Sequence, residues 1–138
     1  MAIAVDFGTS NTVIARWNPV SERPETLTLP GLSLQLATVP PLVPSLIYVE
    51  KPQANGVVVG QAVRDRGLDI AADPRFFANV KRGIGTPLQG FLPDIDGETL
   101  SFEQLGEWFL RSVLTQVREV AGEDDSLVLT VPVDSFEA

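Results

Sequence analysis

The 138-residue chain contains no cysteine and no histidine. The first absence excludes disulfides and thiolate chemistry, and the second excludes imidazole acid–base catalysis and most transition-metal sites. No apolar run approaches the ~20 residues of a membrane-spanning helix. No basic segment follows Met1 as it would in a signal peptide. We therefore expect a cytoplasmic protein that contacts no membrane.

Positive charge is also scarce. Ten Lys and Arg residues accompany 18 Asp and Glu residues, so the formal net charge is −8. Nucleic-acid binding depends on cations that neutralise phosphates, so this balance argues against nucleic acid as a general partner. Hydrophobic residues make up 44% of the chain, which is typical of a globular chain with a buried core. The length indicates one domain or part of one.

A short polar hinge between two apolar stretches is the first informative feature. Apolar residues dominate 2–6 and 12–17, which predicts the two strands of a hairpin. The hinge begins at the last residue of the first strand and consists of Asp6, Phe7, Gly8, Thr9, Ser10 and Asn11. Glycine lets a backbone approach an anion closely, and successive N–H groups there can form an anion-binding concavity. The pattern favours phosphate binding, although an ordinary polar hairpin turn uses the same residue types.

The carboxylate of Asp6 adds a requirement to this interpretation. It would repel a phosphate unless a divalent cation lay between the two. A hard cation held through oxygen atoms and water satisfies that requirement. We therefore expect a metal-dependent phosphate site at the hinge, with Asp6 on the metal side; an ordinary turn aspartate is the alternative.

Strands are expected over much of the next region. Polar and apolar residues alternate at 25–29, which predicts a half-buried strand. Strands are also expected at 45–50 and 57–59, on either side of an Asn55-Gly56 turn. The Pro- and Leu-rich residues 30–44 predict an extended, partly exposed connector, because proline excludes a helix.

The strongest helix signal covers 102–121. Apolar residues recur there at three- and four-residue spacing. Ser101 with Gln104 matches a capping box, and Gly122 suits the C-terminal end of the helix. Weaker patterns predict a modest helix over 60–72, a helical turn around 76–82, a strand over 126–131 and a further helix start at Asp134 and Glu137.

A second segment also combines carboxylates with glycine. Residues 86–100 are interpreted as a loop or hairpin that turns at Asp96-Gly97. The surrounding residues 94–99 lack the small-residue run of the hinge and the further ligands of a calcium-binding loop. We therefore expect a plain turn here.

Several segments, taken in order, resemble the heat-shock-70 (DnaK-like) chaperone branch of the actin-like ATPase superfamily. The hinge is similar to that superfamily's first phosphate loop. Residues 43–48 (Val-Pro-Ser-Leu-Ile-Tyr) resemble a Thr-Pro-Ser strand start, and 80–85 (Val-Lys-Arg-Gly-Ile-Gly) a Lys-Arg-x-Ile-Gly segment. Residues 59–63 (Val-Gly-Gln-Ala-Val) resemble the family's Gly-Gln-Ala helix start, and Asp73-Pro74 resembles its Asn-Pro turn. Residues 129–136 (Leu-Thr-Val-Pro-Val-Asp-Ser-Phe) resemble its Thr-Val-Pro-Ala-x-Phe strand end. Residues 30–42 are richer in Pro and Leu than the family's connector.

The resemblance implies an α/β fold. It would be part of an actin-like, ribonuclease H-like ATPase lobe, in which helices pack on a mixed sheet and a peripheral subdomain is attached. The core lobe would take about 1–30 and 101–138. The peripheral subdomain would take about 31–100.

The resemblance also implies roles for particular residues. Asp6 would hold Mg²⁺ through water. Lys81 would reach the γ-phosphate and help to place the attacking water, because phosphoryl transfer relies on positioning and electrostatic stabilisation; a solvated basic pair with Arg82 is the alternative. The β- and γ-phosphates of ATP or ADP would be wrapped by Gly8, Thr9, Ser10 and Asn11.

The activity implied is that of a chaperone involved in protein folding and the stress response. The parent protein would hydrolyse ATP with magnesium to drive the binding and release of unfolded peptide clients, together with co-chaperones. The family's second phosphate loop and adenosine motif are expected beyond Ala138. We therefore expect these 138 residues alone to be inactive and to bind nucleotide weakly or not detectably. Two alternatives remain: a carbohydrate kinase on the same scaffold, or a truncated, non-enzymatic module that self-associates through apolar surface.

Overall fold

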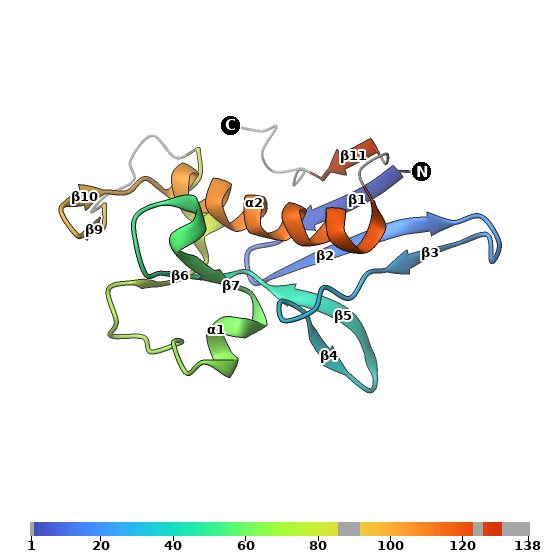
Figure 1. Ribbon diagram of the computed structural model, residues 1–138, viewed down its shortest axis with the longest axis horizontal. Helices are drawn as coiled ribbons and strands as arrows, with labels where there is room; N and C mark the ends of the chain where they lie inside the picture. Colours follow the sequence, from blue (N-terminus) through green and yellow to red (C-terminus); the bar gives the residue numbers. More distant parts are fainter. Residues whose placement is uncertain (1, 86–91, 123–125, 131–138) are drawn as a thin grey trace.

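The computed structural model describes residues 2–85, 92–122 and 126–130 (Figure 1). Over these residues the chain forms a mixed α/β structure with three sheets and two α-helices. The largest sheet has six strands in the order β11-β1-β2-β5-β4, and β3 also pairs with β2. The prediction of a mixed α/β class is confirmed at this level.

The predicted N-terminal hairpin is present. Strand β1 (Ala2–Phe7) pairs antiparallel with β2 (Asn11–Asn18), and Phe7 lies opposite Thr12 at the closed end. Strand β11 (Ser126–Leu129) runs parallel to β1 on its other side. The turn between β1 and β2 therefore lies at the end of a sheet that is paired on both sides of β1.

Helix α2 (Phe102–Ala121) confirms the strongest helix prediction. The Ser101 hydroxyl oxygen accepts a hydrogen bond from the Gln104 N–H at 3.1 Å, and Gly122 follows the helix with φ of 90°. The helix lies across one face of the main sheet (Figure 1). The Phe7 ring stacks on that of Phe109, with centroids 5.4 Å apart. The core at this contact consists of Ile3, Val5, Phe7 and Ile14 of the sheet and Leu105, Phe109, Val113 and Val117 of the helix.

Strand β3 lies earlier in the chain than predicted. It covers Arg23–Thr26 instead of 25–29, and pairs with β2. Leu27 and Leu29 are nevertheless buried in the core beyond its end. The alternation therefore identified the buried side chains correctly but not the hydrogen-bonded segment.

Residues 30–44 are more than a connector, so that prediction was incomplete. Strands β4 (Leu34–Leu36) and β5 (Val39–Pro44) form an antiparallel pair at the end of the main sheet. Strand β5 meets β2 only through Val43 and Pro44. Proline is tolerated in strands where few N–H donors are needed, so this short pairing accommodates a proline-rich strand.

The second sheet confirms the strands predicted around the Asn55-Gly56 turn. Strand β6 (Leu46–Val49) is central, and β7 (Val57–Val59) and β8 (Phe76–Ala78) pair with it antiparallel. The 3₁₀ turn η1 (Ala54–Gly56) joins β6 to β7. This sheet contributes Ile47 to the same core that helix α2 covers.

Two helix predictions in this region were wrong in extent. Helix α1 covers only Gln61–Asp65 instead of 60–72, and Gly67 follows it with φ of 67°. The helical turn expected over 76–82 is replaced at its start by β8, because pairing with β6 overrides weak local propensity. Only its second half is helical, as the 3₁₀ turn η2 (Val80–Gly83).

The predicted turn at Asp96-Gly97 is present. It joins strands β9 (Asp94–Ile95) and β10 (Glu98–Thr99), and both turn residues have positive φ, 52° and 84°. Part of the predicted 86–100 loop, at 86–91, lies outside the described residues. The helix start predicted at Asp134 and Glu137 lies outside them as well.

One hydrophobic core joins the two regions that the sequence assigned to separate subdomains. It combines Val5 and Leu105 from the expected core lobe with Val59 and Val80 from the expected peripheral region. The subdomain boundaries stay a prediction. Among the described helices, none combines the length and apolar character needed to cross a membrane.

Candidate functional site

The turn at residues 6–11, called here the first loop, is tightly closed. The Gly8 N–H donates to the Asn11 carbonyl oxygen at 3.0 Å. A Cβ atom at position 8 would lie 2.3 Å from that same oxygen. Only glycine therefore fits at position 8, because any side chain would push the two ends of the turn apart.

Lys81 reaches the first loop from η2. Its Nζ donates a hydrogen bond to the Phe7 carbonyl oxygen, 74 residues away in the sequence. The same Nζ lies 5.7 Å from the centroid of the Phe7 ring, within cation–π range. Its neighbour Arg82 is exposed. Of the two adjacent cations, Lys81 is therefore the one held at the loop; its action on a phosphate stays a prediction.

A buried pair of hydroxyls supports the loop from beneath. The Ser45 Oγ donates to the Gly8 carbonyl oxygen at 2.8 Å, and the Ser45 N–H donates to the Ser10 carbonyl oxygen at 2.9 Å. The Thr12 Oγ1 lies 2.9 Å from the Ser45 Oγ. Thr12 is fully buried and Ser45 nearly so. No local sequence pattern indicates a role for either residue, although Ser45 lies within the 43–48 segment that resembles the chaperone family.

Asp6 points away from helix α2. Its side chain is exposed, whereas its neighbours Val5 and Phe7 are buried on the helix side of the sheet. The Thr130 hydroxyl donates to the Asp6 Oδ1 at 2.8 Å, and the Thr130 N–H donates to the Val5 carbonyl oxygen at 3.0 Å. Thr130 was another residue missed at the sequence level, because only the parallel pairing of β11 brings it to β1.

Two backbone N–H groups of the loop are unpaired in the part of the chain that the structure describes. The carbonyls of Phe7, Gly8 and Ser10 are all engaged by Lys81 or Ser45. Within residues 2–85, 92–122 and 126–130, the backbone N–H groups of Thr9 and Ser10 donate to no acceptor. Unpaired successive N–H groups beside a cation suit an anion. Thr9 and Ser10 carry hydroxyls that can add further donors.

These residues fit a magnesium–phosphate ligand. Mg²⁺ is typically held by one or two carboxylates, with waters and substrate phosphates completing its octahedron. Asp6 supplies one exposed carboxylate at the loop. The described part of the chain contains no cluster of three or more acidic, His or Cys side chains that would form an all-protein cage. A metal at Asp6 would therefore depend on phosphate oxygens for the rest of its coordination.

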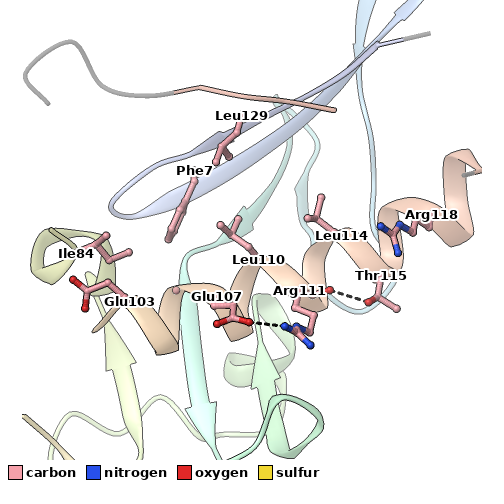
Figure 2. A pocket seen from close by; sticks show the side chains of 11 residues that line it. Phe7, Ile84, Glu103, Glu107, Leu110, Arg111, Leu114, Thr115, Arg118 and Leu129 are labelled. Carbon is pink, nitrogen blue, oxygen red and sulfur yellow. Dashed lines mark hydrogen bonds and ion pairs between the residues drawn. The ribbon is translucent and has the colours of Figure 1, made fainter. Parts of the chain in front are cut away.

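A large cavity lies elsewhere. It has a volume of about 800 Å³ and opens between helix α2 and the strands β1 and β11 (Figure 2). Leu110 and Leu114 of the helix face Phe7 and Leu129 of the strands across it. The lining also includes Arg111, Thr115 and Arg118 of the helix, and Arg111 is paired with Glu107. None of these three residues belongs to the motifs that predict a phosphate site, so we place the candidate site at the first loop.

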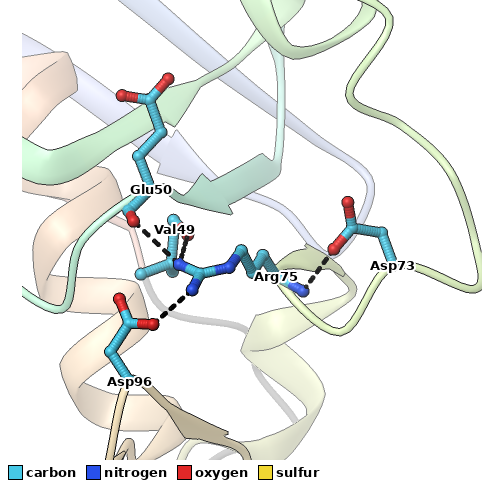
Figure 3. A network of polar contacts seen from close by, with 5 residues as sticks. All are labelled: Val49, Glu50, Asp73, Arg75 and Asp96. Carbon is cyan, nitrogen blue, oxygen red and sulfur yellow. Dashed lines mark hydrogen bonds and ion pairs between the residues drawn. The ribbon is translucent and has the colours of Figure 1, made fainter.

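The second acidic turn, residues 94–99, has a different environment. The Asp96 Oδ1 is 2.5 Å from the Arg75 guanidinium, which also donates to the carbonyls of Val49 and Glu50 (Figure 3). The hydrogen bond to Asp96 is the main cause that raises the pKa of Arg75 above its ordinary value. The negative charge of Asp96 is thus already paired with the guanidinium of Arg75. This pairing agrees with the prediction of a plain turn.

Comparison with known protein families finds no family model that matches this chain. A search of curated proteins also finds no significant match.

Proposed function

We propose that the first loop is the first phosphate-binding loop of a magnesium-dependent, actin-like ATPase of the heat-shock-70 chaperone type. In the parent protein, ATP hydrolysis would drive the binding and release of unfolded peptides, assisted by co-chaperones. The 138 residues would form one side of the nucleotide clamp. The sequence motifs support the choice of family, and the geometry of the loop supports the phosphate chemistry.

The strongest support for this proposal is the contact between Lys81 and the first loop. Two segments 74 residues apart each resemble a different motif of the same family, and the Lys81 Nζ donates to the Phe7 carbonyl oxygen. If Lys81 and Arg82 were only a solvated basic pair, both side chains would be expected to extend into water, and neither would bind the glycine turn. The unpaired N–H groups of Thr9 and Ser10 support the same conclusion.

Each group at the loop would have a distinct task. The N–H groups of Thr9 and Ser10 would bind phosphate oxygens, and Asp6 would hold a Mg²⁺-bound water. The ammonium of Lys81 would offset phosphate charge, which requires it to exchange the Phe7 carbonyl for a phosphate oxygen. Mg²⁺ would neutralise charge on the β- and γ-phosphates and orient them for attack.

Titration of the ¹⁵N-labelled chain with inorganic pyrophosphate tests this proposal. We expect the amide signals of Thr9 and Ser10 to shift at millimolar ligand, more strongly with Mg²⁺ than without. Lys81→Met should weaken this binding about tenfold, since a hydrogen bond to a charged group contributes about 1.5–3 kcal/mol. Arg82→Met is the matched control because Arg82 is the adjacent exposed cation. Equal loss in both variants, or no shift in the unmodified chain, would contradict the proposal.

A further test separates the chaperone from a carbohydrate kinase on the same scaffold. The coding sequence downstream of Ala138 should contain a second Asp-Gly-Gly phosphate loop, followed by a β-rich peptide-binding domain. An aspartate in a sugar-binding cleft would instead identify a kinase.

A further inference from the structure

The strongest unassigned feature is the buried hydroxyl pair beneath the first loop. Ser45 makes three hydrogen bonds there: to the Gly8 carbonyl, to the Ser10 carbonyl and to the Thr12 hydroxyl. Its position 37 residues from Gly8 means that no local turn rule requires these contacts. Burying a hydroxyl costs free energy unless it is hydrogen-bonded. The hydrogen bonds of Ser45 and Thr12 offset that cost.

The direction of these hydrogen bonds is fixed by counting hydrogens. A serine hydroxyl has one hydrogen, and Ser45 donates it to the Gly8 carbonyl at 2.8 Å. The 2.9 Å contact between the two hydroxyls must then be donated by Thr12 to Ser45. The result is a two-step chain from Thr12 through Ser45 to Gly8, and it ends on the loop backbone.

This chain sets the orientation of a peptide plane. The Gly8 carbonyl and the Thr9 N–H belong to one planar peptide unit, and in a trans peptide they point in opposite directions. The described residues contain no cis peptide bond. A hydrogen bond that holds the Gly8 carbonyl on the Ser45 side therefore turns the Thr9 N–H away from Ser45. That N–H has no acceptor within the described part of the chain.

We infer that Ser45, oriented by Thr12, is a positioning residue that holds the Thr9 N–H ready for a phosphate oxygen. This inference rests on the proposed function of the first loop. Ser45 does not touch the ligand; it acts through the Gly8–Thr9 peptide. Preorganised donors bind an anion without reorganisation at the moment of binding, so loss of the Ser45 hydroxyl should weaken phosphate binding even in a chain that remains folded.

The first measurement is hydrogen exchange of the Gly8 and Ser45 amides, whose hydrogen bonds close the loop. Ser45→Ala should accelerate their exchange about tenfold relative to the unmodified chain. Thr12→Val keeps the Ser45–Gly8 bond and should give a smaller acceleration. Ser101→Ala is the control, because it removes a helix cap of α2 and leaves the loop contacts in place. Unchanged exchange at Gly8 in Ser45→Ala would overturn the inference.

The second measurement is binding of magnesium pyrophosphate, followed through the Thr9 amide signal. Ser45→Ala should bind about tenfold more weakly, Thr12→Val should lie between, and Ser45→Thr, which keeps a hydroxyl, should recover part of the loss. Equal affinities in Ser45→Ala and Ser101→Ala would overturn the positioning role while leaving the phosphate site intact. If the unmodified chain binds no pyrophosphate, the proposed function fails and so does the phosphate role of Ser45; the exchange data then decide only whether Ser45 orders the loop.

Discussion

The two acidic turns of this protein, 6–11 and 94–99, have similar ingredients and different environments. Each segment contains an aspartate, a glycine and a hydroxyl, and each joins two antiparallel strands. At the second turn the cation of Arg75 pairs with the Asp96 carboxylate. At the first loop the cation of Lys81 is held by a backbone carbonyl instead. The ammonium of Lys81 is therefore bound to a neutral carbonyl and forms no ion pair with a carboxylate in the described residues.

This difference shows what makes a glycine turn suitable for an anion. Lys81 and Ser45 engage the carbonyls of Phe7, Gly8 and Ser10, and the N–H groups of Thr9 and Ser10 stay unpaired in the described structure. The support of the second turn engages its carboxylate and completes an ion pair. The residue types within a turn are therefore less informative than the contacts that arrive from distant segments.

The largest expected difference between the turns lies in their glycines. In Gly8→Ala the new Cβ would meet the Asn11 carbonyl oxygen at 2.3 Å and disrupt the hydrogen bond that closes the loop. We expect a loss of about 3 kcal/mol in the free energy of unfolding. In Gly97→Ala the new Cβ would meet no atom within 4 Å. We expect a loss of only about 1–2 kcal/mol in the free energy of unfolding, because the left-handed φ of +84° strains a residue with a side chain. Urea denaturation of both variants measures this, and equal losses would contradict the comparison.

The two cations should differ in what they hold in place. Lys81→Met removes a hydrogen bond and a cation–π contact, so we expect a loss of about 1 kcal/mol and faster hydrogen exchange at the Gly8 amide. Arg75→Met should loosen the second turn and leave exchange at Gly8 unchanged. Exchange data on both variants decide the point. Acceleration at Gly8 in Arg75→Met would mean that the two turns are coupled.

A smaller effect is expected from Tyr48, which lies near the Arg75 network. Burial, and then the Asp73 carboxylate, raise the pKa of this tyrosine above its ordinary value. It is the only tyrosine in the chain, so absorbance during alkaline titration reports it directly. The midpoint should lie above about 10, and Asp73→Asn should lower it.

The sign of the corresponding stability change follows from linkage. Because the unfolded chain releases the tyrosine proton at a lower pH than the folded chain, stability should fall as the pH rises beyond about 10. Below that pH the contribution of Tyr48 is constant. A midpoint at or below the ordinary value would contradict the assignment of its surroundings.

The smallest expected effect concerns ATP hydrolysis. The 138 residues alone should show no ATP hydrolysis above background, because only one side of the proposed clamp is present. Phosphate release with saturating Mg²⁺ and ATP measures this, with Asp6→Asn as the control. Turnover by the unmodified chain that Asp6→Asn abolishes would show that the first loop is sufficient for catalysis and would contradict the account.

Local sequence signals identified part of this architecture. The hairpin around Gly8, helix α2 and the Asp96-Gly97 turn were predictable because strand alternation, helix caps and turn residues act over a few positions. The strand β8 and the pairing of β4 with β5 were not, because each depends on a partner distant in the chain. The same limit applies to the site. Gly8 and Lys81 could be proposed from motifs, whereas the contacts of Ser45 and Thr130 appear only after the strands are paired.

The most direct test of the account is a map of amide shifts in the ¹⁵N-labelled chain as Mg²⁺ and ATP are added together. We expect the amide signals of residues 8–11 to shift at millimolar nucleotide, and those of the acidic turn 94–99, where Asp96 is already paired to Arg75, to stay in place. Shifts of equal size in both turns, or no shift at 8–11, would contradict the claim that the first loop is a phosphate site.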